Sequence, residues 1–212
     1  MYAISLTSIP PRFGQLPQVL GALVGQVVRP DVVFLTIPKR YRRFESRALP
    51  ALPFGVALIE PEDDPGPIGK LRPAAARYGG DLLICDDDWL YAPDWAAAFL
   101  RVRDDHPKAV LAASSWESGR IGRPGRTVPQ GFAGVMFPSA LARTIPEPPE
   151  AAWSVDDVWM AGHLPEVVAV PDARGKMRPL SDPGALQLSP ERDAANRAAA
   201  ALWPDATKVS EP

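Results

Sequence analysis

The stretch that decides the fold is GGDLLICDDDWLYAPDW, residues 79–95. Its first part, residues 81–85, is a short apolar run of the kind that forms a buried strand in a parallel sheet. Three aspartates at residues 86–88 follow this run directly, and Asp94 stands where the next helix is expected to begin. A buried strand that ends in acidic residues is typical of α/β proteins, whose ligands bind beyond the carboxyl ends of the strands.

The segments around this stretch alternate between short apolar runs and amphipathic helical patterns. Strands are predicted at residues 3–7, 31–37, 55–60, 81–85, 108–114 and 131–137, and helices at 14–28, 69–78, 94–104, from Ser154 onward and at 190–202. The 26 prolines cluster in the loops between these elements. The order predicts an α/β fold in a single domain over residues 1–204, with one mostly parallel, Rossmann-like sheet flanked by helices and a frayed tail at 205–212.

Composition excludes several classes of function. The formal net charge of −2 gives no global positive field, so a nucleic-acid partner is not expected. The single cysteine, Cys85, excludes an intramolecular disulfide and a cysteine-based zinc site. The sequence shows neither a signal-peptide pattern nor the ~20 apolar residues of a transmembrane helix, so we expect a cytoplasmic protein. The basic run KRYRR at 39–43 is either a solvated loop or a peripheral contact with an anionic membrane surface.

The acidic run after the strand is a candidate metal site. If the chain stays extended, Asp86 and Asp88 share one face and Asp87 points away. Two neighbouring carboxylates repel each other unless a cation joins them, and Mg²⁺ or Mn²⁺ prefers such oxygen ligands. The alternative is a solvated acidic turn in which one aspartate caps the next helix, although Asp94 is available for that cap.

Four stretches together resemble GT-A-fold glycosyltransferases, especially small bacterial ones similar to glycosyltransferase family 2. These stretches are ISLTSIPPR (4–12), EPEDDPGPIGKL (60–71), GGDLLICDDDWLYAPDW (79–95) and VDDVWMAGHL (155–164). The resemblance implies metal-dependent transfer of a sugar from a nucleoside diphosphate sugar, with a UDP-sugar favoured, to a glycan or another hydroxyl acceptor. It also implies a donor half at about 1–105 and an acceptor half at about 106–204.

The resemblance assigns roles at the donor side. Asp86 and Asp88 would hold Mn²⁺ or Mg²⁺, and Asp87 would lie near the ribose or the sugar of the donor. The donor-binding residues that it implies are Thr7, Ser8, Arg12, Asp64, Lys70, Asp86 and Asp87. Lys70 would add a positive charge near the diphosphate, and the neighbouring glycines would let the backbone approach it closely. An ordinary surface lysine after a turn, and simple loop polarity at residues 7–12, are the alternatives.

The acidic pair Asp156 and Asp157 is the candidate catalytic centre. Ser154 followed three residues later by Asp157 is also the pattern of a capping box for the next helix. The resemblance favours Asp157 over Asp156 as the general base of an inverting transfer, and a cap and a base can coexist in such a pair. Trp116 and Trp153 are the predicted acceptor-binding residues, because aromatic faces stack on sugar rings. Phe132 and Trp159 are expected to pack in the core.

Other functions stay open at this level. A metal-dependent nucleotidyltransferase would use the same acidic site, but LTSIPPR lacks a glycine-rich signature loop and the sequence contains no P-loop. A degenerate GT-A domain that binds a nucleotide or a partner without turnover is the non-enzymatic alternative. The chain is short for this fold, which suggests either a partner subunit or an extended glycan acceptor.

Overall fold

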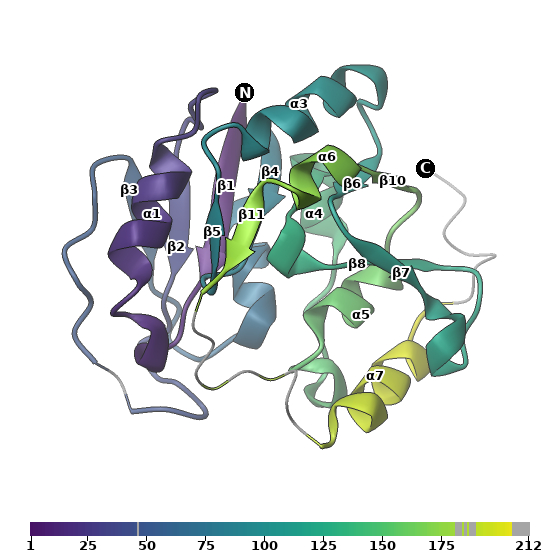
Figure 1. Ribbon diagram of the computed structural model, residues 1–212. Helices are drawn as coiled ribbons and strands as arrows, with labels where there is room; N and C mark the ends of the chain where they lie inside the picture. The colour runs from purple at the N-terminus through teal and green to yellow at the C-terminus, as the bar shows by residue number, and fades with distance from the viewer. Residues whose placement is uncertain (46, 181–183, 185, 187–189, 205–212) are drawn as a thin grey trace.

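The computed structural model describes residues 1–204 except 46, 181–183, 185 and 187–189, so the tail predicted at 205–212 lies outside it. A seven-stranded sheet with the order β10-β6-β9-β4-β1-β2-β3 forms the centre (Figure 1). Its strands are β1 (Tyr2–Thr7), β2 (Val33–Thr36), β3 (Val56–Ile59), β4 (Asp81–Ile84), β6 (Val110–Ala112), β9 (Val135–Pro138) and β10 (Val167–Ala169). Only β9 runs antiparallel to its neighbours β4 and β6. The prediction of a mostly parallel sheet is confirmed.

Alternate residues of the central strands pack into two separate apolar layers, one on each face of the sheet. Ile4 of β1 and Leu83 of β4 belong to one layer, whereas Ala3 and Leu82 belong to the other. Side chains alternate between the faces of a strand, so a sheet covered on both faces needs apolar residues at every position. This is why the strands read as continuous apolar runs in the sequence.

Short helices cover the two faces of the sheet. The first layer includes residues of α1 (Leu16–Val24), α3 (Trp95–Asp105) and α6 (Pro171–Arg174), and the second includes residues of α2 (Arg72–Ala75) and α4 (Ser139–Thr144). The buried residues of α1 recur three and four apart, as predicted for one face of a helix, and the helix ends before Gly25. Within the part of the chain that the structure describes, none of the helices has the length and apolar character that crossing a bilayer requires.

A third apolar cluster lies beside the sheet. It joins α5 (Asp156–Ala161) and α7 (Arg192–Ala201) to the antiparallel pair β7 (Ser115–Glu117) and β8 (Thr127–Pro129), which Figure 1 shows together, away from α1 and β3. A second antiparallel pair joins β5 (Trp89–Tyr91) to β11 (Met177–Pro179). The 3₁₀ turns are η1 (Pro10–Arg12), η2 (Gly66–Lys70), η3 (Ser118–Ile121), η4 (Gly131–Ala133) and η5 (Glu150–Ala152).

Two predicted elements differ from the structure. The helix expected over 69–78 is divided into η2 and α2, because Pro73 lacks an N–H and fits only the first turn of a helix. The strand expected over 131–137 begins only at Val135, since residues 131–133 form the turn η4 and Gly134 adopts a φ of +106°. Both differences place turns beside the pocket described below.

The predicted side-chain caps are also wrong. Asp94 occupies the N-cap position of α3 but makes no cap hydrogen bond; instead its carboxylate pairs with Lys176. The N–H of Ala96, in the first turn of α3, donates to the side-chain amide oxygen Oε1 of Gln26 at 2.8 Å, so the cap comes from a residue far away in the sequence. At α5 the N-cap is Val155, and the Ser154 capping box does not form because Asp157 Oδ1 accepts the N–H of Gly131.

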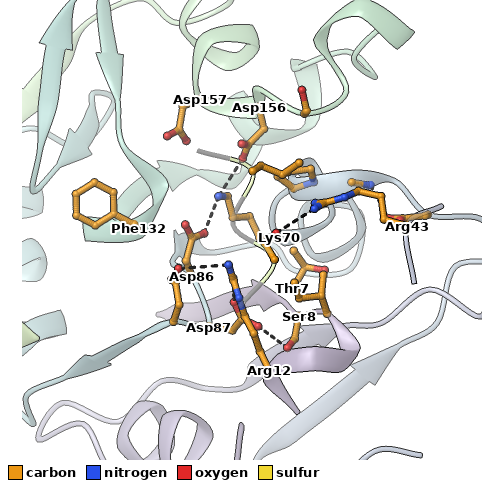
Figure 2. Close-up of a pocket in the computed structure, with 18 of the residues that line it drawn as sticks. Thr7, Ser8, Arg12, Arg43, Lys70, Asp86, Asp87, Phe132, Asp156 and Asp157 are labelled. Atoms are coloured by element: carbon orange, nitrogen blue, oxygen red, sulfur yellow. Dashed lines mark hydrogen bonds and ion pairs between the residues drawn. The ribbon is translucent and has the colours of Figure 1, made fainter. Parts of the chain in front are cut away.

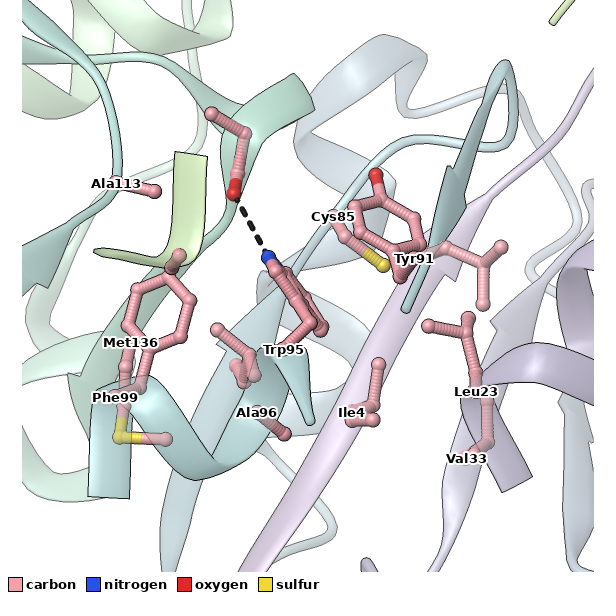
Figure 3. Packing of buried hydrophobic residues seen from close by; sticks show 14 of the residues in the cluster. Ile4, Leu23, Val33, Cys85, Tyr91, Trp95, Ala96, Phe99, Ala113 and Met136 are labelled. Carbon is pink, nitrogen blue, oxygen red and sulfur yellow. Dashed lines mark hydrogen bonds between the residues drawn. The ribbon is translucent and has the colours of Figure 1, made fainter. Parts of the chain in front are cut away.

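A substitution at Gly134 tests the packing of the first layer. Trp95 Nε1 donates to the Ala133 carbonyl oxygen at 3.2 Å, and Figure 3 shows Trp95 packed among the buried residues of this layer. A Cβ at Gly134 would lie 2.5 Å from the Trp95 ring and 2.8 Å from that of Phe99. Gly134→Ala is therefore expected to lower the free energy of unfolding by about 2–4 kcal/mol in urea unfolding. Gly21→Ala is the control, because nothing lies within 4 Å of a Cβ there, and it should not destabilise. Equal stability of the two variants would contradict the packing.

Candidate active site

A pocket of about 310 Å³ opens at the carboxyl ends of β1 and β4. This is where ligands bind in open α/β sheets, and its volume lies at the lower end of the range for small-molecule sites. Its walls include every predicted site residue except Trp116: Thr7, Ser8, Arg12, Asp64, Lys70, Asp86, Asp87, Asp88, Trp153, Asp156 and Asp157. Figure 2 shows those that it labels converging from the end of β1, η1, η2, the segment after β4 and the start of α5.

Asp87 is clamped to the segment that follows β1. Ser8 Oγ donates to Asp87 Oδ2, and Arg12 Nη1 donates to Asp87 Oδ1 at 2.6 Å. Gln15 Nε2 adds a hydrogen bond of 3.0 Å to the Asp87 carbonyl oxygen. Burial raises the pKa of the Asp87 carboxyl, and Arg12 and Ser8 oppose that rise. The Asp87 carboxylate therefore holds residues 86–88 against the segment that contains Ser8 and η1.

Lys70 lies buried between carboxylates from two different elements. Its ammonium is 2.7 Å from Asp86 Oδ1 and 3.0 Å from Asp156 Oδ2. Burial by itself lowers the pKa of the Lys70 ammonium, but the charges of Asp156, Asp86 and Asp157 outweigh it and hold the pKa well above its ordinary value. Lys70 is therefore a permanent cation that connects the turn after β4 to α5.

Asp157 is held at the pocket wall by the backbone. Its Oδ1 accepts the N–H of Gly131 at 3.0 Å, and its side chain is only half-buried. Removal from water, followed by the charge of Asp156, raises the pKa of the Asp157 carboxyl to about 7. Gly131 has no room for a side chain, since a Cβ would lie 2.5 Å from Lys70 Nζ. Gly131 was not predicted as a site residue, because its role depends on contacts across the pocket.

The three aspartates do not alternate as an extended strand would. β4 ends at Ile84, so the chain turns at residues 87–88. As a result Asp86 faces Lys70, whereas Asp88 Oδ2 lies 3.5 Å from the same Arg12 that binds Asp87. The prediction that only Asp87 points away from the other two is wrong, because it assumed that the strand continues.

Asp86 and Asp88 nevertheless fit the chemistry of a divalent-cation site. Asp88 Oδ1 is buried and has no hydrogen-bond partner among the described residues. Burial and then the charge of Asp86 raise the pKa of Asp88 to about 7, which shows that the two carboxylates interact. Within the described ranges no third histidine, cysteine, aspartate or glutamate completes a cluster. Phosphate and water oxygens are ligands that such an ion also accepts.

The pocket rim joins three loops through Asp64 and Trp153. Asp64 accepts the N–H groups of Gly66 (2.8 Å) and Arg42 (3.1 Å), and Trp153 Nε1 donates to the Asp64 carbonyl oxygen at 3.3 Å. Gly66 has a φ of +72°, and a Cβ there would lie 2.7 Å from the Trp153 ring. Arg42 lies over that ring and pairs with Glu150. Trp153 is thus a braced part of the wall.

The basic run at 39–43 has specific acidic partners. Lys39 pairs with Glu62, and Arg40 pairs with Asp63 at 2.8 Å. Arg43, by contrast, lines the pocket and was not predicted as a site residue. These pairs leave the run less suited to an anionic membrane surface than its composition suggests.

The aromatic predictions are only partly matched by the structure. Trp153 lines the pocket, but Trp116 lies outside it, on β7, with the Arg120 guanidinium 3.5 Å from its ring centroid. Trp159 packs in the third cluster as expected, with Nε1 donating to the Pro146 carbonyl oxygen. Phe132 packs against the first apolar layer, as expected, but it also lines the pocket, which was not predicted. Phe132 follows Gly131 and precedes an apolar strand, and this sequence pattern does not distinguish a pocket residue from a core residue.

Comparison with known proteins identifies the fold. No protein-family model matches the sequence, and no curated protein matches it significantly. Among solved structures it is similar to S. aureus TarS 1–349 in complex with UDP, with a TM-score of 0.55 and 14% identity over 81% of this chain and 58% of TarS 1–349. The complex with UDP-GlcNAc gives a TM-score of 0.57 and 13% identity over 87% and 59%. The chain has a GT-A-like fold. It spans less than three-fifths of the length of TarS 1–349.

Proposed function

We propose that this protein is a metal-dependent glycosyltransferase that moves a sugar from a UDP-sugar, or another nucleoside diphosphate sugar, to an acceptor hydroxyl with inversion. One observation carries the proposal. An acidic pair at the end of β4, a buried lysine and a carboxyl with a pKa near 7 line a single pocket of a GT-A-like fold. The UDP and UDP-GlcNAc in the TarS complexes support the choice of a uridine nucleotide.

The donor is proposed to bind along the β1 side of the pocket. Thr7, Ser8, Arg12 and Arg43 offer hydroxyl and guanidinium groups, which suit a base edge, a ribose and phosphate oxygens. Asp86 and Asp88 would hold Mn²⁺ or Mg²⁺. The chemistry that such an ion supplies is Lewis-acid stabilisation of the departing diphosphate. Lys70 holds Asp86 in place by its ion pair.

Asp157 is proposed to act as the general base. It takes the proton of the acceptor hydroxyl while the acceptor oxygen bonds to the anomeric carbon of the donor sugar. The bond from that carbon to the diphosphate breaks, and the nucleoside diphosphate leaves with the electron pair. Asp157 suits this role better than Asp156, because Asp156 is buried and bound to Lys70 whereas Asp157 is exposed to the pocket.

Release of UDP from a panel of UDP-sugars, with Mn²⁺ present and water or added sugars as acceptor, tests the proposal. We expect at least one UDP-sugar to release UDP in a metal-dependent way, and the Asp86→Asn/Asp88→Asn variant to lose that release. Tight UDP binding without turnover of any UDP-sugar would favour the non-catalytic alternative. Release of pyrophosphate from UTP and a sugar 1-phosphate, measured in a parallel assay, would favour the nucleotidyltransferase.

The rate of transfer is expected to depend on pH through Asp157. A base acts in its ionised form, and the surroundings raise the pKa of Asp157 to about 7. The rate should therefore be level above pH 8 and fall about tenfold per pH unit below pH 6. A profile of initial rate from pH 5 to 9 measures this. A rate that stays constant down to pH 5 would contradict the assignment of the base.

A further inference from the structure

The two ends of the pocket differ in chemistry. Figure 2 shows Ser8, Arg12 and Arg43 on one side of Lys70, and Phe132 on the other side, near Asp157. The first end carries cations and hydroxyl groups that suit phosphates and a nucleoside. The second end offers an aromatic ring beside carboxylates, which suits a different kind of ligand.

Phe132 forms a stacked pair with Trp89. The two ring centroids are 5.0 Å apart with an interplanar angle of 29°, and both side chains are half-buried while lining the pocket. The Arg174 guanidinium lies 5.0 Å from the Trp89 centroid and 5.3 Å from that of Phe132, although Arg174 does not line the pocket. The pair is therefore supported from outside the pocket and exposes aromatic surface inside it.

Hydrogen bonds fix this pair relative to the proposed base. The Phe132 carbonyl oxygen accepts the Tyr91 hydroxyl at 2.9 Å, and the same hydroxyl lies 3.0 Å from the Asp86 carbonyl oxygen. The preceding residue, Gly131, donates its N–H to Asp157. These bonds hold the backbone of Phe132 in place relative to both Asp86 and Asp157. A surface that positions a substrate must be fixed in this way.

We propose that Phe132 and Trp89 form the acceptor platform of the enzyme, and that a neutral pyranose of the acceptor stacks its apolar C–H face on Phe132 with one hydroxyl toward Asp157. This inference rests on the proposed function. Sugar hydroxyls can donate to the carboxylates at this end, whereas an anionic acceptor would be repelled by the Asp157 carboxylate. The platform replaces Trp116, which the structure places outside the pocket.

Saturation-transfer NMR tests the platform directly. The probes are the methyl glycosides of glucose, galactose and N-acetylglucosamine, each added to the protein with UDP and Mg²⁺. At least one glycoside should receive saturation mainly at ring C–H protons, and Phe132→Ala should weaken its binding about tenfold. Phe132→Tyr should retain binding, because it keeps the aromatic face. Trp116→Ala is the matched control and should also retain it.

Three results separate the possible failures. Glycoside binding that survives both Phe132→Ala and Phe132→Leu, in variants that melt as the wild type does, overturns the platform. Absence of glycoside binding while UDP binds also overturns it and leaves the proposed donor site intact. Absence of UDP binding to the folded wild type contradicts the proposed function itself, and the platform with it.

Discussion

Asp157→Asn is expected to slow sugar transfer by about 10²–10⁴-fold while leaving UDP binding unchanged. The asparagine Oδ1 still accepts the N–H of Gly131, so the start of α5 keeps its position. Only the capacity to take a proton from the acceptor is lost. The measurement is the initial rate of UDP release from the UDP-sugar that the wild type uses, together with the affinity for UDP.

Glu150→Gln is the control for this variant. Glu150 is an exposed acid on the rim, paired with Arg42, and does not line the pocket. Its loss should leave the rate within about twofold of the wild type, because exposed ion pairs contribute little. An Asp157→Asn enzyme that keeps a tenth or more of the wild-type rate would exclude Asp157 as the base. The acid limb of the pH profile should also disappear in that variant.

Lys70→Met is expected to give the largest loss of stability, about 3–5 kcal/mol. The substitution keeps most of the side-chain volume but leaves Asp86 and Asp156 without the cation between them. For a chain of this length the melting temperature should fall by about 10 °C. Lys176→Met is the matched control, since its pair with Asp94 is more exposed and should contribute little to stability.

A lower pH should partly rescue Lys70→Met. Burial raises the pKa of the Asp157 carboxyl to about 7 and the charge of Lys70 opposes that rise, so without the cation the folded variant should bind that proton at a higher pH than the wild type does. A folded state that binds more protons gains stability as pH falls, so the deficit relative to the wild type should shrink from pH 9 to pH 7. Thermal unfolding at both pH values measures this. An unchanged deficit, or one as small as that of Lys176→Met, would show that the ion pairs do not hold the site together.

The sequence predicted those features that depend on local pattern. The alternation of apolar runs and helical patterns predicted the sheet, and the polar residues after its strands were expected at one edge, where Asp86, Asp88 and Lys70 lie. Parallel strands end at the same edge, so polar residues after each strand meet without any knowledge of side-chain contacts. The same reasoning explains why Thr7 lies in the pocket.

Features that depend on distant contacts were missed or mistaken. The side chain of Gln26, which is distant in the sequence, accepts a hydrogen bond from the first turn of α3. The N–H of Gly131 donates to Asp157, the carboxylate that a capping box would have used. Phe132 stands before an apolar strand and Trp116 in a polar segment, and only the tertiary structure shows that the first lines the pocket and the second does not. Periodicity predicts the helix or strand to which a residue belongs. It does not predict which residues of other segments contact that residue.

Thermal unfolding with UDP tests the central claim, that Asp86 and Asp88 hold a metal at a nucleoside diphosphate site. We expect UDP at 100 times its Kd to stabilise the wild type by about 2.7 kcal/mol when Mn²⁺ is present, and far less without it. The Asp86→Asn/Asp88→Asn variant should fold but lose the metal-dependent shift. A folded wild type that no nucleoside diphosphate stabilises in the presence of Mn²⁺, or a double variant that keeps the full shift, would contradict the assignment.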